Sequence, residues 1–134
     1  MSLIRRTSGR RARGIDRRVE VTRTIHAFLK ANEPQIRAME SRARTHGVPY
    51  AANCGWCVEL ADELERRFPD GEQLATDHAA INPTYFPYSL SQAEVDLMDD
   101  GAHVWFYLQR LHFDAEAPHG VADWRELPLF RRQQ

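Results

Sequence analysis

Two cysteines, a histidine and an aspartate supply the residue types of a nucleophilic site. Cys54 and Cys57 lie in the run Asn53-Cys54-Gly55-Trp56-Cys57, His103 begins a stretch of aromatic and β-branched residues, and Asp114 follows in the same stretch. A thiol becomes an effective nucleophile when a histidine takes its proton and a carboxylate orients the imidazole. Whether such a site exists depends on the elements that hold these side chains.

A β-hairpin is the element expected to hold the histidine and the carboxylate. Residues 101–116 contain two apolar runs separated by the polar pair Gln109-Arg110, which predicts two strands joined by a two-residue turn. In that register Phe106 faces Phe113, and one face of the hairpin is apolar throughout.

His103 and Asp114 fall on the other face of this hairpin. They lie diagonally across from each other, about 7–8 Å apart at the backbone and within side-chain reach. Glu116 is directly opposite His103 in the same register and is the alternative orienting carboxylate. A slip of one residue would put His103 and Asp114 on opposite faces, so their pairing depends on the length of the turn.

A helix start is expected to activate one of the two cysteines. Asn53 is a good N-cap residue, which predicts a helix beginning there with Cys54 in its first turn. Unpaired N–H groups and the helix dipole favour a thiolate at that position and can hold an oxyanion. Cys57 falls on the apolar stripe with Leu60 and Leu64, where a thiol is more often inert. Cys54 is therefore the predicted nucleophile and Cys57 the alternative.

Three neighbouring side chains are candidates for the rest of the site. The Asn53 amide can serve as an oxyanion donor if it does not cap the helix. Trp56 and Trp105 can line a substrate cleft, although aromatic side chains are more often core residues.

The remaining elements predict an α+β protein. Helices are expected from about residue 16 to Asn32 and from Asn32 to Gly47, because Asn32 and Pro34 match a helix start. Residues 72–90 predict at most one short strand, and residues 91–98 a brief helix. A loop is expected after Glu116, followed by a turn capped by Asp123 and an apolar segment, residues 127–130, that packs on the core.

A chain of 134 residues is expected to form one domain. Residues 1–14 are rich in Arg, Ser and Gly without an apolar period, and they are expected to be a disordered basic tail. Residues 15–134 would then form a single α+β domain. Its parts are a helical segment, 15–47, and a core with the Cys, His and Asp, 48–134, in which a small antiparallel sheet packs against the cysteine-bearing helix.

The order of the candidate residues resembles a known superfamily. A cysteine opening a helix, a histidine starting a strand and an acid on the next strand are similar to papain-like, NlpC/P60-like and transglutaminase-like cysteine enzymes. Asn53-Cys54-Gly55 resembles the NlpC/P60 helix start, and Gly101-Ala102-His103-Val104-Trp105 with Phe113-Asp114 resembles the transglutaminase strands. The resemblance covers roughly residues 50–130, extends to small phage and bacterial proteins of this kind, and implies a papain-like core.

The resemblance also implies a mechanism. His103 would take the thiol proton, Asp114 would hold the imidazole, and the cysteine would form an acyl-enzyme from an amide or peptide bond, with no cofactor. Peptidase, amidase and acyl transferase all remain open. The run Cys54-Gly55-Trp56-Cys57 also resembles the papain segment in which the second cysteine is catalytic, which would transfer the role to Cys57.

Other classes compete with this interpretation. The Cys-x-x-Cys run is compatible with a redox pair, but no βαβ pattern surrounds it. A zinc site could use both cysteines with two of the histidines His78, His103, His112 and His119, of which only the last two approach typical zinc-ligand spacing. A non-catalytic interaction module, docking on a protein partner through its basic N-terminal helices, becomes preferable if His103 and Asp114 lie far from both thiols.

Charge is divided unevenly along the chain. Residues 1–46 carry twelve basic and four acidic side chains, and residues 47–134 carry six and fifteen. We favour attraction between the two halves over nucleic-acid binding, because the arginines are scattered without interleaved aromatic residues. No apolar run approaches the length of a membrane span, about 18 residues, and the N-terminus has no secretion-signal core. A cytoplasmic protein without membrane contact is therefore expected.

Overall fold

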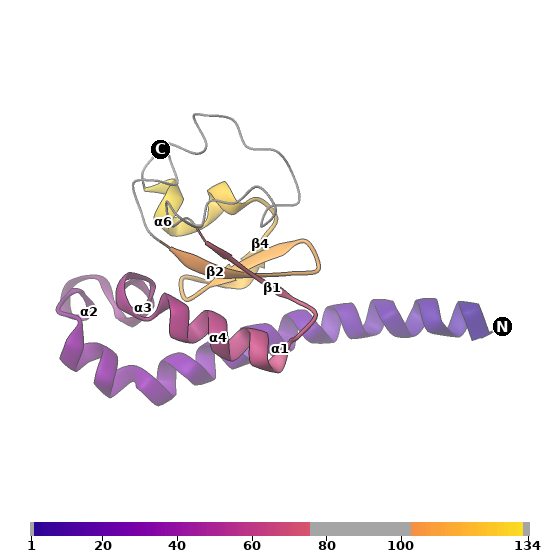
Figure 1. The fold of residues 1–134 in the computed structure, drawn as a ribbon, viewed down its shortest axis with the longest axis horizontal. Helices are drawn as coiled ribbons and strands as arrows, with labels where there is room; N and C mark the ends of the chain where they lie inside the picture. Colours follow the sequence, from indigo (N-terminus) through magenta and orange to yellow (C-terminus); the bar gives the residue numbers. More distant parts are fainter. Residues whose placement is uncertain (1, 76–102, 133–134) are drawn as a thin grey trace.

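A four-stranded antiparallel sheet in the order β1-β2-β3-β4 lies between two groups of helices (Figure 1). The computed structural model describes residues 2–75 and 103–132. The strands are β1 (Glu72–Ala75), β2 (Val104–Leu108), β3 (Leu111–Asp114) and β4 (Ala117–Val121). The helices are α1 (Ser2–Met39), α2 (Arg42–His46), α3 (Val48–Gly55), α4 (Cys57–Arg67), the 3₁₀ turn η2 (Trp124–Glu126) and α6 (Pro128–Arg131). The class is α+β, as expected from the sequence.

The hairpin of β2 and β3 has the predicted turn and register. Gln109 and Arg110 form the whole turn, with φ of 51° and 66°, which is the left-handed pair that a two-residue hairpin turn requires. Phe106 is paired with Phe113, and Leu108 with Leu111. His103 and Asp114 therefore share a face of the sheet.

Both faces of the sheet are buried. Phe106, Leu108 and Phe113 pack with the apolar sides of α1, α3 and α4 in one hydrophobic cluster. On the opposite face Trp105 packs with the C-terminal segment that contains η2 and α6, and Figure 1 shows this segment on the side of the sheet away from α1. The sequence predicted the packing of residues 127–130 on the core, and Phe130 is fully buried.

α1 runs through Pro34, where we expected one helix to end and another to begin. A proline inside a helix removes one hydrogen bond and costs about 3 kcal/mol. Asn32 does not cap a helix, because its side-chain amide donates to the Phe28 carbonyl at 2.8 Å. Ile36, beyond the proline, is fully buried. Packing against the core thus outweighs the local signal to stop.

α1 also begins earlier than expected. Its backbone is helical from Ser2, whereas residues 1–14 were expected to be a disordered tail, and Figure 1 shows the first part of the helix extending beyond the sheet. Lengthening an existing helix is easier than nucleating one, because each added residue brings a hydrogen bond. A segment without an apolar period can therefore continue a helix that is anchored elsewhere.

β4 occupies a stretch for which the sequence predicted a loop. Pro118 lies within it, and a proline is tolerated because β4 is an edge strand. Gly120 has a φ of +81°, and an added Cβ there would meet the Phe113 ring at 2.8 Å. The carbonyl of Pro118 accepts a hydrogen bond from the Thr22 hydroxyl of α1 at 2.7 Å. Contacts with α1 thus support a strand that local sequence signals disfavour.

Some expectations fall outside the described residues. These are the helix over residues 91–98 and the zinc candidate His78. β1 agrees with the single short strand expected in residues 72–90. Asp123 caps η2 as predicted, accepting the Arg125 N–H at 2.9 Å. In residues 2–75 and 103–132 no helix combines the length and apolar character needed to cross a membrane.

Candidate active site

Cys57 is the first residue of α4, because the helix breaks at Trp56. α3 ends at Gly55, and Trp56 has φ −128° and ψ 15°, outside the α-helical region. The expected helix start near Asn53 is therefore wrong, since Asn53 and Cys54 both lie within α3. The physical argument for an activated thiol at a helix N-terminus applies instead to Cys57.

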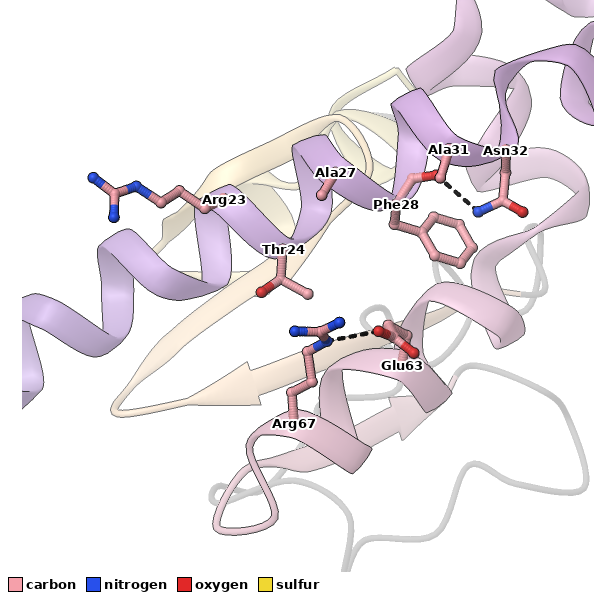
Figure 2. Close-up of a pocket in the computed structure, with 8 residues that line it drawn as sticks. All are labelled: Arg23, Thr24, Ala27, Phe28, Ala31, Asn32, Glu63 and Arg67. Carbon is pink, nitrogen blue, oxygen red and sulfur yellow. Dashed lines mark hydrogen bonds and ion pairs between the residues drawn. The ribbon is translucent and has the colours of Figure 1, made fainter.

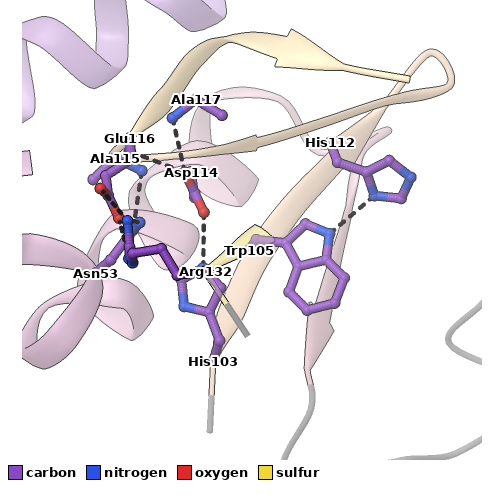
Figure 3. A network of polar contacts seen from close by, with 9 residues as sticks. All are labelled: Asn53, His103, Trp105, His112, Asp114, Ala115, Glu116, Ala117 and Arg132. Atoms are coloured by element: carbon purple, nitrogen blue, oxygen red, sulfur yellow. Dashed lines mark hydrogen bonds and ion pairs between the residues drawn. The ribbon is translucent and has the colours of Figure 1, made fainter. Parts of the chain in front are cut away.

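His103 and Asp114 form a buried pair on the face of the sheet that the hairpin register predicted. Nε2 of His103 lies 2.9 Å from Oδ2 of Asp114, as Figure 3 shows. The two residues are only 1% and 2% exposed. Solvent therefore competes little for this hydrogen bond, which fixes the imidazole ring.

The thiol that meets His103 is Cys57. Burial raises the pKa of the Cys57 thiol, but the neighbouring His103 side chain and the backbone of Val104 and Val58 together lower it. Because Asp114 engages Nε2, the ring nitrogen of His103 that faces the thiol is Nδ1. Cys57 as a whole residue is half-buried.

The electrostatics of the pair favour a thiolate beside an imidazolium. Burial by itself lowers the pKa of His103, but the hydrogen bonds and charges of Asp114 and Cys57 outweigh it and raise the pKa to about 9. Burial also opposes ionisation of Cys57, yet its interaction with His103 leaves the thiol pKa below the ordinary value of 9.0. Both shifts favour the charged pair over the neutral pair.

Asp114 is held by the backbone as well as by His103. Its Oδ1 accepts the N–H groups of Glu116 at 2.9 Å and Ala117 at 2.8 Å. These bonds leave Oδ2 directed at the imidazole, so the turn between β3 and β4 sets the geometry of the pair.

Glu116 and Asn53 do not take the roles expected of them. The Glu116 carboxylate forms a two-point ion pair with Arg132, both contacts at 3.0 Å. Asn53 donates to Glu116 at 2.9 Å and accepts the Ala115 N–H at 3.2 Å, and Figure 3 shows all three side chains at this turn. Glu116 is therefore not the orienting carboxylate, and the Asn53 amide is engaged in structure rather than directed at an oxyanion. Arg132 was not indicated by the sequence.

Cys54, the predicted nucleophile, lies in a different environment. It lies near Arg42, Arg132 and Tyr50, and it is one of the groups that raise the pKa values of Arg42 and Arg132. The reason is the helix break, which places Cys54 within α3 while Cys57 opens α4 beside β2. Of the two thiols, the structure brings Cys57 to His103.

The two tryptophans also differ from expectation. Trp105 is 1% exposed. Its indole N–H donates to Nδ1 of His112 at 2.9 Å. Trp56 is partly buried and packs against the core cluster of α1, α3 and α4, next in sequence to Cys57, so it remains the tryptophan that can contact a molecule at the thiol.

The geometry gives little support to the two competing kinds of site, a redox cysteine pair and a zinc site. Cys54 and Cys57 are free thiols with different partners. In the described part of the chain, no three His, Cys, Asp or Glu side chains gather as metal ligands. His112 contacts Trp105, and His119 lies edge-on to His26 with ring centroids 6.0 Å apart, so the two histidines with zinc-like spacing have separate neighbours.

One groove in the described part of the structure does not reach Cys57. It has a volume of about 510 Å³ and lies between α1 and α4 (Figure 2). Phe28 and two alanines of α1 face Glu63 and Arg67 across it, and the latter two form an ion pair at 2.7 Å. The groove shares no residue with the thiol, the imidazole or the carboxylate.

Comparison with known proteins found no match among protein-family models, curated proteins or solved structures. The chemistry of the site is therefore argued from its own geometry.

Proposed function

We propose that this protein is a cysteine hydrolase or acyl transferase that acts on an amide or peptide bond. Cys57 is the nucleophile, His103 the acid and base, and Asp114 the residue that orients the imidazole. One observation carries the proposal: a thiol at a helix start has its pKa lowered by a neighbouring imidazole, and Nε2 of that imidazole lies 2.9 Å from a buried carboxylate. These are the parts that nucleophilic catalysis by cysteine requires.

Acylation is the first half of the reaction. The Cys57 thiolate attacks the carbonyl carbon, a C–S bond forms, and the carbonyl electrons move to the oxygen. The first N–H groups of α4 have no partners within the helix, and such groups can stabilise the oxyanion. The His103 imidazolium then gives its Nδ1 proton to the leaving nitrogen, the C–N bond breaks, and a thioester remains.

Deacylation restores the free cysteine. Neutral His103 takes a proton from water, whose oxygen bonds to the carbonyl carbon of the thioester. The C–S bond then breaks, a carboxylic acid is released, and Cys57 is returned as the thiolate beside the His103 imidazolium. An amine in place of water would yield a new amide, and the enzyme would then be a transferase. Asp114 stabilises the imidazolium in both halves and holds the ring in one orientation.

The sequence resemblance supports the same assignment. In the papain segment that Cys54-Gly55-Trp56-Cys57 resembles, the second cysteine is catalytic. The order Cys57, His103, Asp114 is similar to that of the papain-like enzymes. Because a thiolate nucleophile must stay reduced, a cytoplasmic location is part of the proposal.

An activated ester tests for the acyl-enzyme directly. We expect p-nitrophenyl acetate to add one acetyl group to Cys57, found by mass spectrometry of the intact chain and of its peptides. The Cys57→Ser variant should not accumulate this species, and Cys54→Ser is the matched control that should retain it.

The pH dependence of alkylation gives a second test of the thiol. Iodoacetamide should react with Cys57 in the folded chain at lower pH than with the same cysteine after denaturation, because the folded thiol has the lower pKa. Equal pH profiles for the folded and denatured chain would contradict the proposal, as would faster acetylation of Cys54 than of Cys57.

A further inference from the structure

His112 is a buried imidazole that the proposed mechanism does not use. It lies on β3 and is 1% exposed. Its Nδ1 accepts the indole N–H of Trp105 at 2.9 Å. A nitrogen that accepts a hydrogen bond carries no proton, so this contact requires the neutral imidazole with its proton on Nε2.

Trp105 connects His112 to the candidate catalytic histidine. His103 and Trp105 are two positions apart at the start of β2 and point to the same face of the sheet. Their rings are stacked, with centroids 5.9 Å apart and planes inclined by 25°. Figure 3 shows the indole between His103 and His112. The plane of the indole therefore limits the planes open to the His103 ring.

A second aromatic ring confines His103 from another direction. Phe130 of α6 meets His103 edge-on, with centroids 6.1 Å apart, and meets Trp105 at 5.5 Å. Rotation of the indole would thus disturb both its stack on His103 and its contact with Phe130. The hydrogen bond to His112 is the polar contact that fixes the rotation of the indole.

We infer that His112 and Trp105 are positioning residues for His103. His112 fixes the indole through its N–H, and the stacked indole holds the imidazole in the plane where Nε2 meets Asp114 and Nδ1 meets Cys57. The inference rests on the proposed function, since it assigns these residues to the same site. It accounts for a buried histidine that has no part in proton transfer.

Substitutions at His112 distinguish a role in positioning His103 from a role in core packing alone. His112→Gln supplies an amide oxygen that can accept the indole N–H, whereas His112→Leu has a similar volume and cannot. Trp105→Phe keeps an aromatic ring but loses the donor. Tyr107→Phe is the matched control, because the Tyr107 ring also contacts His112, at 4.6 Å, but lies on the side away from His103.

The measurement is the rate of iodoacetamide alkylation of Cys57 against pH in the full chain, below the unfolding temperature of each variant. Among the described residues, charged and titratable groups that face the two histidines are Asp114 and Cys57 at His103, and Asp123 and Tyr107 at His112. We expect His112→Leu and Trp105→Phe to slow alkylation near neutral pH by about tenfold, since small misplacements of a catalytic group cost rate. His112→Gln and Tyr107→Phe should stay near wild type.

The outcomes distinguish this inference from the proposed function. If the wild-type thiol is activated and His112→Leu has the wild-type pH profile, with only a lower melting temperature, His112 serves packing alone and the inference is overturned. Failure of His112→Gln to restore the rate lost in His112→Leu also counts against it. If wild-type Cys57 itself behaves like a denatured thiol, the proposed function is what fails.

Discussion

Asp114 uses its two oxygens for different partners, and this division makes a sharp prediction. Asp114→Asn can still accept the N–H groups of Glu116 and Ala117 through its amide oxygen, but its NH₂ group then faces Nε2 of His103. The imidazole would have to accept at Nε2, which stabilises the wrong tautomer and removes the charge that favours the imidazolium. We expect Cys57 alkylation at neutral pH to fall by about tenfold or more.

Asp123→Asn is the control for Asp114→Asn. Asp123 is also a carboxylate that accepts a backbone N–H, that of Arg125, but it is not a partner of His103. Alkylation of Cys57 should be unchanged in this variant. An equal loss in both variants would mean that the effect comes from general destabilisation.

At the residue scale, the sequence could identify the histidine and the carboxylate but not the thiol. His103 and Asp114 are paired across a hairpin, where alternation and turn length determine which side chains meet. Cys54 and Cys57 differ by three positions, and the choice between them depends on a helix break that neither residue causes. The sequence therefore indicated Cys57 only as the alternative nucleophile to Cys54.

Among the elements, the two-residue turn at Gln109 and Arg110 leads to a prediction about the free energy of unfolding. Both residues have left-handed φ values, which cost free energy for side chains other than Gly, Asn and Asp. Gln109→Asn combined with Arg110→Gly should raise the free energy of unfolding by about 1 kcal/mol. Urea denaturation measures the change.

The alkylation rate of Cys57 should be unaffected by the improved turn, because both residues are exposed and distant from the thiol. Replacing both with alanine is the control, since alanine keeps the unfavourable φ. A gain in stability from the alanine pair would contradict the assigned turn.

Element boundaries were the least predictable part of the fold. The sequence signals for α3 are Pro49 in its first turn and Gly55 at its end. They are weaker than the N-cap signal of Asn53. That signal predicted that a helix begins at Asn53, which lies two residues before the end of α3. At Pro34 and Pro118 the sequence predicted an interruption, whereas the structure has a helix at Pro34 and a strand at Pro118. Each lies in a regular element because packing with distant residues compensates for the lost hydrogen bond, and single-sequence patterns do not report such contacts.

For the whole molecule, His112 predicts how stability changes with pH. Burial lowers the pKa of His112 from 6.5 to about 4. Between these values the unfolded chain binds a proton that the folded chain does not, so the free energy of unfolding falls as the pH falls. The shift corresponds to about 3 kcal/mol over this window. His103, with a pKa raised to about 9, is protonated in both states below pH 6.5 and adds little there.

Urea titrations from pH 7 to pH 4 measure this slope. His112→Gln has no titrating group at this position, so its loss of stability over the same range should be smaller than that of wild type. The difference between the two slopes isolates His112 from the carboxylates, which titrate mainly at the acidic end. Parallel curves for the two proteins would contradict the assignment of a neutral, buried His112.

The unequal charge of the two chain halves is partly used within the fold. Arg17 of α1 pairs with Asp70, and Arg18 donates to the His119 carbonyl at 2.8 Å. Both contacts join the basic first part of the chain to its acidic second part. Of the two, the ion pair of Arg17 with Asp70 is an attraction between opposite charges of the two halves, whereas the Arg18 contact is a hydrogen bond to a backbone carbonyl.

The three groups of the candidate site come from contacts of different range along the chain. His103 and Asp114 are 11 residues apart and meet across one hairpin, so this pair is a local contact that closes a short loop. Cys57 belongs to α4, which reaches His103 only when that helix docks on the sheet. The imidazole and the carboxylate are thus positioned by a small unit of secondary structure, whereas bringing the thiol to them requires tertiary assembly. Reactivity at Cys57 consequently reports that α4 has docked, and it links any chemistry of the site to completed folding of the chain.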